Sequence, residues 1–490
     1  MRSFLLLFGL LLSHTLLGQG NLVQPQFTPQ QLQADFAVLE KAYKTLHPGL
    51  YKYADKATID RYFDECRASL NRSQSLSEAY LAIMKLTAQF KCGHSYPNFF
   101  NQEGNVKAMF NQKNSLPFWF RLVENRMLIT KSADATVPVG VEVLSINGTP
   151  VSKLIDTMLP LVRADGSSTG KRLKLLEISG QGYEYFDVLH PLLFPNPTPT
   201  FALKTRNLTT NRESVATVNG VLHSERDAQI RKNDPTQIDS IATFRWLNPT
   251  TALLTINSLA NWDNSFKFGK FYDRAVTEFN QKKGENLVID IRRCEGGDLW
   301  SGKQLIRHLI SKPIIINEQQ DSWAYVSIDS SLSPYISNQW AYKWRYRNAD
   351  DFVQLPGGQY RGKRDGNGQR LDPHENQLTG RLFLLTSATN SSAGWQFASV
   401  FREHNLATLV GQETGGNQKG ITAGALFFVV LPNTKIEVDV PLIGMSYEEA
   451  AKRPDTGLMP DILVKPTVKA AVAGVDQELE AVQNLLSKQK

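Results

Sequence analysis

Two polar turns in the C-terminal half of the chain carry the residue types of a serine-hydrolase site. The first turn, Asp290 to Gly297, follows the apolar run 287–289 and ends in paired glycines. The second turn, Thr386 to Gly394, follows the apolar run 382–385 and leads into a helix-like stretch over 393–404. A hydroxyl at such a strand-to-helix turn lies near the positive end of the helix, beside backbone N–H groups that can bind an oxyanion. The pattern therefore predicts nucleophilic chemistry at a serine.

Either turn alone is weak evidence, because glycine pairs and serine-rich turns commonly just connect elements. Taken together, and followed by the segment Ala407 to Gly416, they resemble the family of C-terminal-processing (tail-specific) and tricorn-core serine peptidases. The closer branch is the tricorn-core and retinoid-binding-protein-like one. The resemblance covers the C-terminal half well and the rest weakly. It implies a multidomain α/β protein whose catalytic core has the spiral fold shared with Clp proteases and crotonases.

Ser392 matches the nucleophile of that family, since it stands directly before Ala393 and Gly394. A serine hydroxyl attacks only when a base accepts its proton. In the C-terminal-processing branch the base is a lysine, but Asn417 occupies its place here. Lys419, two residues later, is an alternative base, although its pKa would have to fall by about three units. Histidine needs almost no such shift, because its ordinary pKa is about 6.5.

His94 is the histidine with a motif around it. Cys92 to Ser95 resembles the Asp-Gly-His-Ser/Thr pattern of the tricorn-core branch except at its first position, so we predict His94 as general base rather than an ordinary cap or core histidine. A histidine base usually needs a third group that fixes its tautomer. The resemblance implies a neighbouring serine, where Gly93 stands here, and a distant glutamate, for which Glu448 and Glu449 are the candidates. Both glutamates equally fit a solvent-facing role.

The resemblance also implies an oxyanion hole made of two backbone amides, one in the Gly296–Gly297 turn and one at Ala393. Loss of such a donor typically slows catalysis about a hundred- to thousandfold. We expect Asp290 and Arg292 to brace the turn rather than to touch substrate.

Two rival functions remain open on the sequence. Cys294 and Trp395 replace an asparagine and an acidic residue often found in the family, and Trp395 fits either a pocket or a packing role. Trp395 and the missing serine at Gly93 favour a non-catalytic relative that binds peptides or apolar ligands, whereas Ser392, His94 and the glycine turns oppose it. The second rival is an esterase-type hydrolase using Ser95, since the segment around it partly matches the Gly-x-Ser-x-Gly elbow. Pro97 in place of the final glycine, and a helix before the motif, count against it.

Periodicity and turn signals divide the chain into units. Capping boxes begin helices at Thr28 and Ser75, and alternating runs from Phe118 end in a segment that resembles part of a PDZ domain, for which a plain β-hairpin is the alternative. Strands and helices then alternate, as in a layered α/β domain. We expect a signal peptide over 1–19, a helical domain over 20–105, a PDZ-like β module with an irregular linker over 106–235, a peptidase core over 236–468 and a C-terminal helix over 469–490.

Composition narrows the class of protein. The chain has 490 residues, of which 41% are hydrophobic and 21% charged, with 54 basic and 47 acidic residues spread evenly, so we expect a globular protein that does not bind nucleic acid. The apolar run 4–12 after a basic residue predicts export to the periplasm or beyond, with no membrane segment after cleavage. Three cysteines exclude a disulfide scaffold but allow one Cys66–Cys92 bridge.

These inferences predict an exported serine endopeptidase that acts on protein or peptide substrates through an acyl-enzyme on Ser392, with His94 as general base. We expect no cofactor and no metal, because no two histidines have metal-ligand spacing in the sequence.

Overall fold

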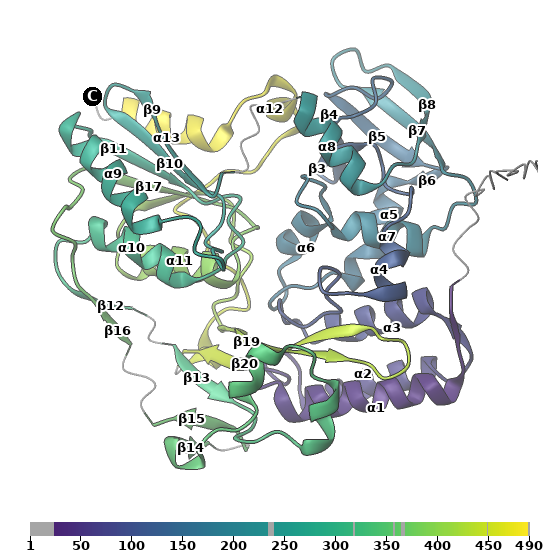
Figure 1. Cartoon of the computed structure of the whole chain (residues 1–490). Helices are drawn as coiled ribbons and strands as arrows, with labels where there is room; N and C mark the ends of the chain where they lie inside the picture. Colours follow the sequence, from purple (N-terminus) through teal and green to yellow (C-terminus); the bar gives the residue numbers. More distant parts are fainter. Residues whose placement is uncertain are drawn as a thin grey trace, which may run out of the picture.

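The computed structural model describes residues 24–233, 240–316, 319–355, 358–363, 368–447 and 449–488, so the expected signal peptide at 1–19 lies outside the described residues. An α/β unit forms one side of the molecule, and N-terminal helices with an antiparallel sheet form the other (Figure 1). A long hairpin from the C-terminal part of the chain reaches across to the N-terminal helices. The predicted combination of an α/β core with additional units is confirmed.

A six-stranded sheet organises the core, with strand order β21-β18-β17-β11-β10-β9. Only β9 runs antiparallel to its neighbour. Helices α9, α10 and α11 bury one face of the sheet and α13 the other, which explains why the strands read as continuous apolar runs. The strands are β9 (Ala242–Asn248), β10 (Thr251–Ile256), β11 (Asn286–Asp290), β17 (Arg381–Thr386), β18 (Thr408–Gly411) and β21 (Ile462–Leu463), and the helices are α9 (Phe268–Gln281), α10 (Leu299–Leu309), α11 (Ser392–Glu403) and α13 (Gln477–Ser487).

The N-terminal unit is helical, as predicted. It contains α1 (Pro29–Leu46), α2 (Lys56–Ser69), α3 (Leu76–Gln89) and α4 (Gly104–Phe110), with the short strands β1 (Gln26–Phe27) and β2 (Gln74–Ser75) pairing beside them. Both predicted capping boxes form, at Thr28 before α1 and at Ser75 before α3. These caps fix where the helices begin, and the end of α3 in turn sets the start of the loop that carries His94.

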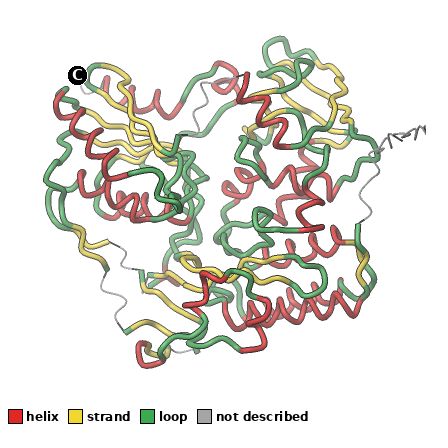
Figure 2. The backbone as a smooth tube through the Cα atoms, in the orientation of Figure 1, coloured by secondary structure: helices red, strands yellow, loops and turns green. Residues whose placement is uncertain are grey.

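An antiparallel sheet of order β3-β4-β5-β7-β8 follows (Figure 2). Its strands are β3 (Phe118–Val123), β4 (Arg126–Ser132), β5 (Val141–Ile146), β7 (Thr200–Asn207) and β8 (Glu213–Asn219), with the short β6 (Thr149–Pro150) beside β5. The prediction of irregular chain from about residue 160 was wrong. Four short helices lie around the last strands: α5 (Val151–Met158), α6 (Thr169–Leu176), α7 (Tyr185–Leu193) and α8 (His223–Asn233). Pro191 inside α7 and the weak amphipathic pattern of α8 concealed them, because tertiary packing rather than local propensity holds such helices.

The long hairpin consists of β19 (Ile421–Val430) and β20 (Glu437–Ser446), within a second sheet of order β14-β15-β13-β20-β19. Its other strands are β13 (Gln320–Trp323), β14 (Phe352–Gln354) and β15 (Tyr360–Gly362), and a separate pair joins β12 (Ile314–Ile316) to β16 (Gln369–Leu371). The hairpin packs on α1, where the Tyr43 hydroxyl donates to the carbonyl of Asp439 at 2.8 Å. Its turn also binds α1, because the backbone N–H of Thr434 donates to Asp35 at 2.8 Å. The hairpin thereby fixes the N-terminal unit to the core.

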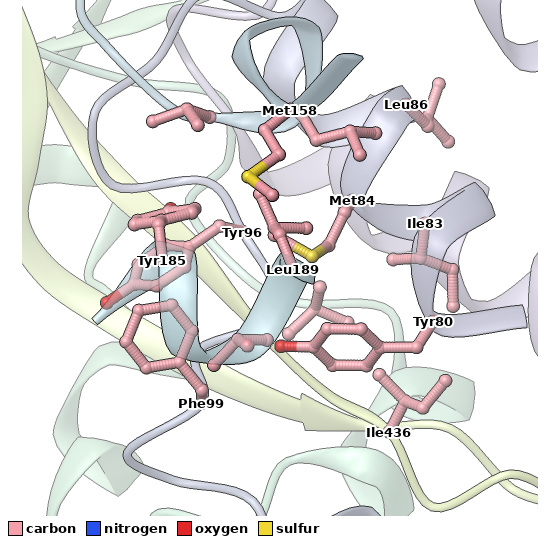
Figure 3. Close-up of a cluster of buried hydrophobic side chains, with 14 of the residues drawn as sticks. Tyr80, Ile83, Met84, Leu86, Tyr96, Phe99, Met158, Tyr185, Leu189 and Ile436 are labelled. Atoms are coloured by element: carbon pink, nitrogen blue, oxygen red, sulfur yellow. The ribbon is translucent and has the colours of Figure 1, made fainter. Parts of the chain in front are cut away.

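A buried aromatic cluster holds the chain just after His94 (Figure 3). Tyr96 and Phe99 lie in it, and Phe99 packs edge-on against Tyr185 with ring centroids 5.1 Å apart. The Tyr80 hydroxyl of α3 donates to the Pro97 carbonyl at 2.6 Å, and Tyr96 also pairs with Asp439 of β20 through its backbone. These contacts give the loop one conformation, which a residue positioned for catalysis requires.

The three cysteines are free and buried, so the Cys66–Cys92 bridge that the sequence allowed does not form. The Cys66 thiol lies 3.8 Å from the Ala82 carbonyl and the Cys92 thiol 3.6 Å from the Thr422 carbonyl, in different parts of the interior. Within the described ranges, no helix has the length and apolar character needed to cross a membrane.

Candidate active site

The two residues predicted to exchange a proton lie together. Nε2 of His94 is 3.2 Å from Oγ of Ser392, although 298 positions separate them in the chain. His94 lies in the loop after α3, and Ser392 is the first residue of α11. The N-terminal unit and the core therefore each contribute one side of the site, and the basic side chain hydrogen-bonded to the Ser392 hydroxyl is His94 and not Lys419.

The backbone at Ser392 is strained. Its φ is +49°, in the left-handed region that a serine rarely occupies. Asn390 holds the turn, since its buried amide donates to the carbonyls of Ile291 at 2.6 Å and Cys294 at 2.9 Å. The backbone carbonyl of Asn390 in turn accepts hydrogen bonds from the backbone N–H groups of Gly415 and Gly416. Such strain persists only where the surroundings enforce it, and it is common at catalytic nucleophiles.

The two glycines of the first turn lie directly against the nucleophile. A Cβ atom at Gly296 would come 3.0 Å from both the Ala393 nitrogen and the Ser392 Cβ. Gly297 has a φ of +137°, and a Cβ there would come 2.0 Å from the Ala260 nitrogen. Gly297 has no room for a side chain, whereas a Cβ at Gly296 would need its neighbours to shift by a few tenths of an ångström. The Ala393 N–H belongs to the first turn of α11, where backbone donors have no partner within the helix and the helix dipole is positive. The arrangement can receive a negative oxygen beside Ser392.

An ion-pair network braces the first turn, as predicted for Asp290 and Arg292. Arg292 pairs with Asp290 at 2.7 Å and reaches Asp476 at 2.8 Å and Glu478 at 3.1 Å. The Ser387 hydroxyl of the second turn donates to the Arg292 carbonyl at 2.6 Å. The network joins both catalytic turns to the start of α13, and none of its side chains lines the site cavity.

Four charged side chains for which the sequence predicted no role surround His94. Glu295 accepts Lys171 at 2.9 Å and Arg163 at 3.2 Å, and Asp165 lies behind His94. Burial lowers the pKa of His94, with Arg163 and Lys171 acting in the same direction and Asp165 and Glu295 opposing them. Burial acts to raise the pKa of Glu295, but Lys171 and Arg163 outweigh it and hold that pKa well below its usual value. His94 is therefore neutral at pH 7, the form that can accept a proton.

Neither predicted glutamate is seen beside His94. Glu449 is 67% exposed on its side chain and pairs with Lys452 at 2.6 Å, and Glu448 lies outside the described residues. Nδ1 of His94 is buried without a hydrogen-bond partner in the described part of the chain. The structure thus gives Glu449 the solvent-facing role.

The other residues with a functional role proposed from the sequence, Ser95, Trp395 and Cys294, are buried. The Ser95 hydroxyl is fully inaccessible and lies 3.0 Å from Nε2 of His47, whose pKa burial lowers to about 3, so a substrate cannot reach the nucleophile of the esterase hypothesis. Trp395 is buried under Gly416, which has no room for a Cβ, and this supports packing rather than a pocket role. Cys294 is buried too, and burial raises its pKa to about 12, which leaves it an unreactive thiol.

A cavity of about 720 Å³ opens at Ser392 and His94, with walls from both sides of the molecule. Its apolar lining includes Tyr96, Phe100 and Trp262, of which Trp262 is 78% exposed. Arg163 and Arg293 contribute positive charge to the wall. The cavity thus places the Ser392 hydroxyl beside aromatic and charged side chains from both sides of the molecule.

A second group of potential metal ligands lies on α9, α10 and the loop before β17. Donor atoms of Asp273, His308 and His374 lie within 4.8 Å of one another, so the expectation from sequence spacing missed a histidine pair that the fold assembles. The rings of that pair stack with centroids 4.0 Å apart. Nδ1 of His374 accepts the Asn376 N–H at 3.1 Å, which places the proton of its neutral ring on Nε2. Stacked rings and this tautomer do not present two lone pairs to one ion.

Comparison with known proteins agrees with this geometry. Residues 250–464 match the model of Peptidase family S41. No curated protein matches the chain in sequence. The structure of mature CPAF complexed with lactacystin has a TM-score of 0.67 at 15% identity, covering 94% of this chain and 98% of that one. A second mature CPAF structure has a TM-score of 0.64 at 15% identity, covering 94% and 97%.

Another similar structure is the photosystem II D1 C-terminal processing protease, with a TM-score of 0.40 at 13% identity, covering 92% of this chain and 98% of that one. The two CPAF structures show a shared fold over nearly the whole chain, including the N-terminal units. The family match spans both polar turns and Ser392. The core of this chain, over residues 250–464, matches Peptidase family S41, which supports a serine-type peptidase.

Proposed function

We propose that this protein is an exported serine endopeptidase that cleaves peptide bonds through an acyl-enzyme on Ser392, with His94 as general base. The observation that carries the proposal is the 3.2 Å contact between Nε2 of His94 and Oγ of Ser392. A buried imidazole with a lowered pKa, a hydroxyl at a helix start and adjacent glycine turns together supply base, nucleophile and anion site.

The reaction follows from these positions. Nε2 of His94 takes the proton of Ser392 as Oγ bonds to the carbonyl carbon of the substrate, and the carbonyl oxygen becomes negative. The imidazolium then gives that proton to the amide nitrogen, whose bond to carbon breaks, and the N-terminal part of the substrate remains as an ester on Ser392. Water, deprotonated by His94, attacks the ester and restores the hydroxyl.

Backbone amides at Gly296 or Gly297 and at Ala393 stabilise the negative oxygen in this proposal. Their support is the tight approach of Gly296 to Ala393 and the position of Ala393 in the first turn of α11. Each donor of this kind is worth about 3–4 kcal/mol in the transition state. A side chain at Gly296 would press on the Ala393 amide and on Ser392. A side chain at Gly297 would clash with the backbone of Leu259 and Ala260.

Substrates in this proposal are proteins or peptides that enter the cavity between the two sides of the molecule. Two sides that must both contact the substrate favour an unfolded segment over a compact surface. Export is inferred from the apolar run 4–12 and its basic neighbour at position 2.

Covalent labelling tests the proposal. A fluorophosphonate probe should modify Ser392, identified by peptide mass spectrometry, and a fluorogenic peptide library should be cleaved by the wild-type protein and not by Ser392→Ala or His94→Ala. Lys419→Ala is the matched control and should retain activity, because the contact to Ser392 comes from His94. Peptide binding without cleavage or labelling would instead support the non-catalytic relative.

A further inference from the structure

Asp165 is a buried carboxylate directly behind the proposed base. It lies in the loop between the short 3-10 helix η1 (Leu159–Leu161) and α6, and it is 1% exposed. Its Oδ1 accepts the backbone N–H of Gly93 at 2.8 Å. Its Oδ2 is buried without a hydrogen-bond partner in the part of the chain that the structure describes. A carboxylate oxygen can only accept, so the position calls for a donor.

The neighbouring donor is His94. Nδ1 of His94 is also buried and unpartnered among the described residues, and donor atoms of His94, Asp165 and Cys92 lie within 4.8 Å of one another. An unpaired buried polar atom costs about 1–3 kcal/mol, so a hydrogen bond from Nδ1 of His94 to the Asp165 carboxylate would relieve both groups. Catalytic hydrogen bonds are commonly long without substrate and shorten once it is bound.

Gly93 makes room for this carboxylate. A Cβ atom at Gly93 would come 2.7 Å from Oδ2 and 3.1 Å from Cγ of Asp165. The position beside His94 at which the resemblance implied a serine is therefore a glycine because Asp165 fills the space that a side chain there would need. The carboxylate beside His94 is thus supplied by Asp165, from a segment distant in the sequence.

Several contacts hold the Asp165 loop against the His94 loop. Arg163 donates to the Gly93 carbonyl, the Gly166 N–H donates to the Lys91 carbonyl at 2.9 Å, and Nζ of Lys91 donates to the Ser167 hydroxyl at 3.0 Å. These contacts tie the two loops together and hold the carboxylate in place relative to the imidazole.

We propose that Asp165 is the positioning residue of the catalytic site, accepting Nδ1–H of His94 in place of the glutamate expected near residues 448–449. This inference rests on the proposed function. The contact keeps the lone pair of Nε2 directed at Ser392 and stabilises the imidazolium that forms during attack. It also accounts for Asp165 acting on the pKa of His94 against the effect of burial.

Asp165→Asn tests the proposal with little change in volume. The Gly93 N–H keeps the amide oxygen of Asn on its own side, so the NH₂ group faces Nδ1 of His94 and favours the wrong tautomer. We expect kcat on the peptide library to fall about a hundred- to ten-thousandfold with KM within threefold, and fluorophosphonate labelling of Ser392 to slow in parallel. Asp35→Asn is the comparison for stability alone, because Asp35 is 3% exposed and also accepts backbone N–H groups but does not line the site cavity.

Nitrogen-15 spectra of the histidine rings give a readout independent of activity. The chain has 8 histidines, and comparison with His94→Gln assigns the His94 signals. We expect the Nδ1–H tautomer in the wild-type protein and the Nε2–H tautomer in Asp165→Asn. An Nε2–H tautomer in the wild-type protein, or kcat/KM of Asp165→Asn within threefold of wild type, would overturn the proposal.

Peptide cleavage and the His94 tautomer together distinguish a failure of the proposed function from a failure of the role proposed for Asp165. If the wild-type protein cleaves no peptide, the proposed function fails while the tautomer still decides the role of Asp165. If Asp165→Asn does not fold, the wild-type tautomer alone decides it. A purely structural Asp165 would lower the melting temperature without reversing the tautomer.

Discussion

Gly296 lies so close to Ser392 that a Cβ atom on the glycine would be 3.0 Å from the Cβ of the serine. The first polar turn thus forms a wall of the cavity directly beside Ser392. A methyl group at position 296 is therefore expected to affect the catalytic rate more than the stability of the fold.

Gly296→Ala is expected to lower kcat about a hundred- to thousandfold while leaving the protein folded, because the methyl group displaces the Ala393 amide from the oxyanion. Steady-state kinetics and thermal melting measure the two effects. Gly170→Ala is the control, since a Cβ there meets only Ala388 at an ordinary 3.4 Å. Unchanged kcat in Gly296→Ala would exclude this turn from the oxyanion hole.

Ser392→Gly and Ser392→Ala should both abolish hydrolysis but differ in stability. Glycine relieves the positive φ of +49° and alanine does not, so we expect the glycine variant to unfold at a free energy about 1 kcal/mol higher than the alanine variant. Urea denaturation of the two inactive proteins measures the difference. Equal stability would mean that the backbone at position 392 is not strained.

The pH dependence of kcat/KM should follow the ionisation of His94. Burial lowers its pKa, so the neutral, active form predominates down to a lower pH than for an ordinary histidine. Activity should rise with pH along a limb whose midpoint lies below 6.5 and reach its plateau before neutrality. A limb centred near pH 9–10 would instead point to a lysine base such as Lys419.

Arg292→Ala should destabilise the protein by about 2–4 kcal/mol in urea denaturation, because it leaves Asp290 and Glu478 as partly buried carboxylates without their shared cation. Activity should fall as well, since both catalytic turns attach to Arg292. Arg370→Ala is the control, as its pair with Asp372 is exposed and worth less than about 1 kcal/mol.

Trp262→Ala is expected to raise KM several-fold with kcat nearly unchanged, because this exposed ring lines the cavity away from the reacting atoms. Loss of an aromatic contact area costs about 1–2 kcal/mol of binding. Trp340→Ala removes a similarly exposed ring that is not part of the cavity and should change neither constant.

Local sequence patterns were sufficient to predict the main strands, helices and polar turns of the core. The apolar runs, glycine turns and capping boxes predicted the strands β10, β11, β17 and β18, the helices around them and the two turns that hold Gly296 and Ser392, because each depends on residues next to one another in sequence. The same holds for Asp290 and Arg292, whose positions two residues apart make their pairing local.

Tertiary structure alone decided the rest. Nothing near His94 in sequence indicates Asp165, and nothing near Ser392 indicates Lys171 or Arg163, since their effects depend on loops brought together by the aromatic cluster and by the hairpin β19–β20. The residue types and turns that make a serine reactive are encoded locally. Which base and which acid serve it is a matter of distances between segments far apart in the chain, and those distances exist only in the folded protein.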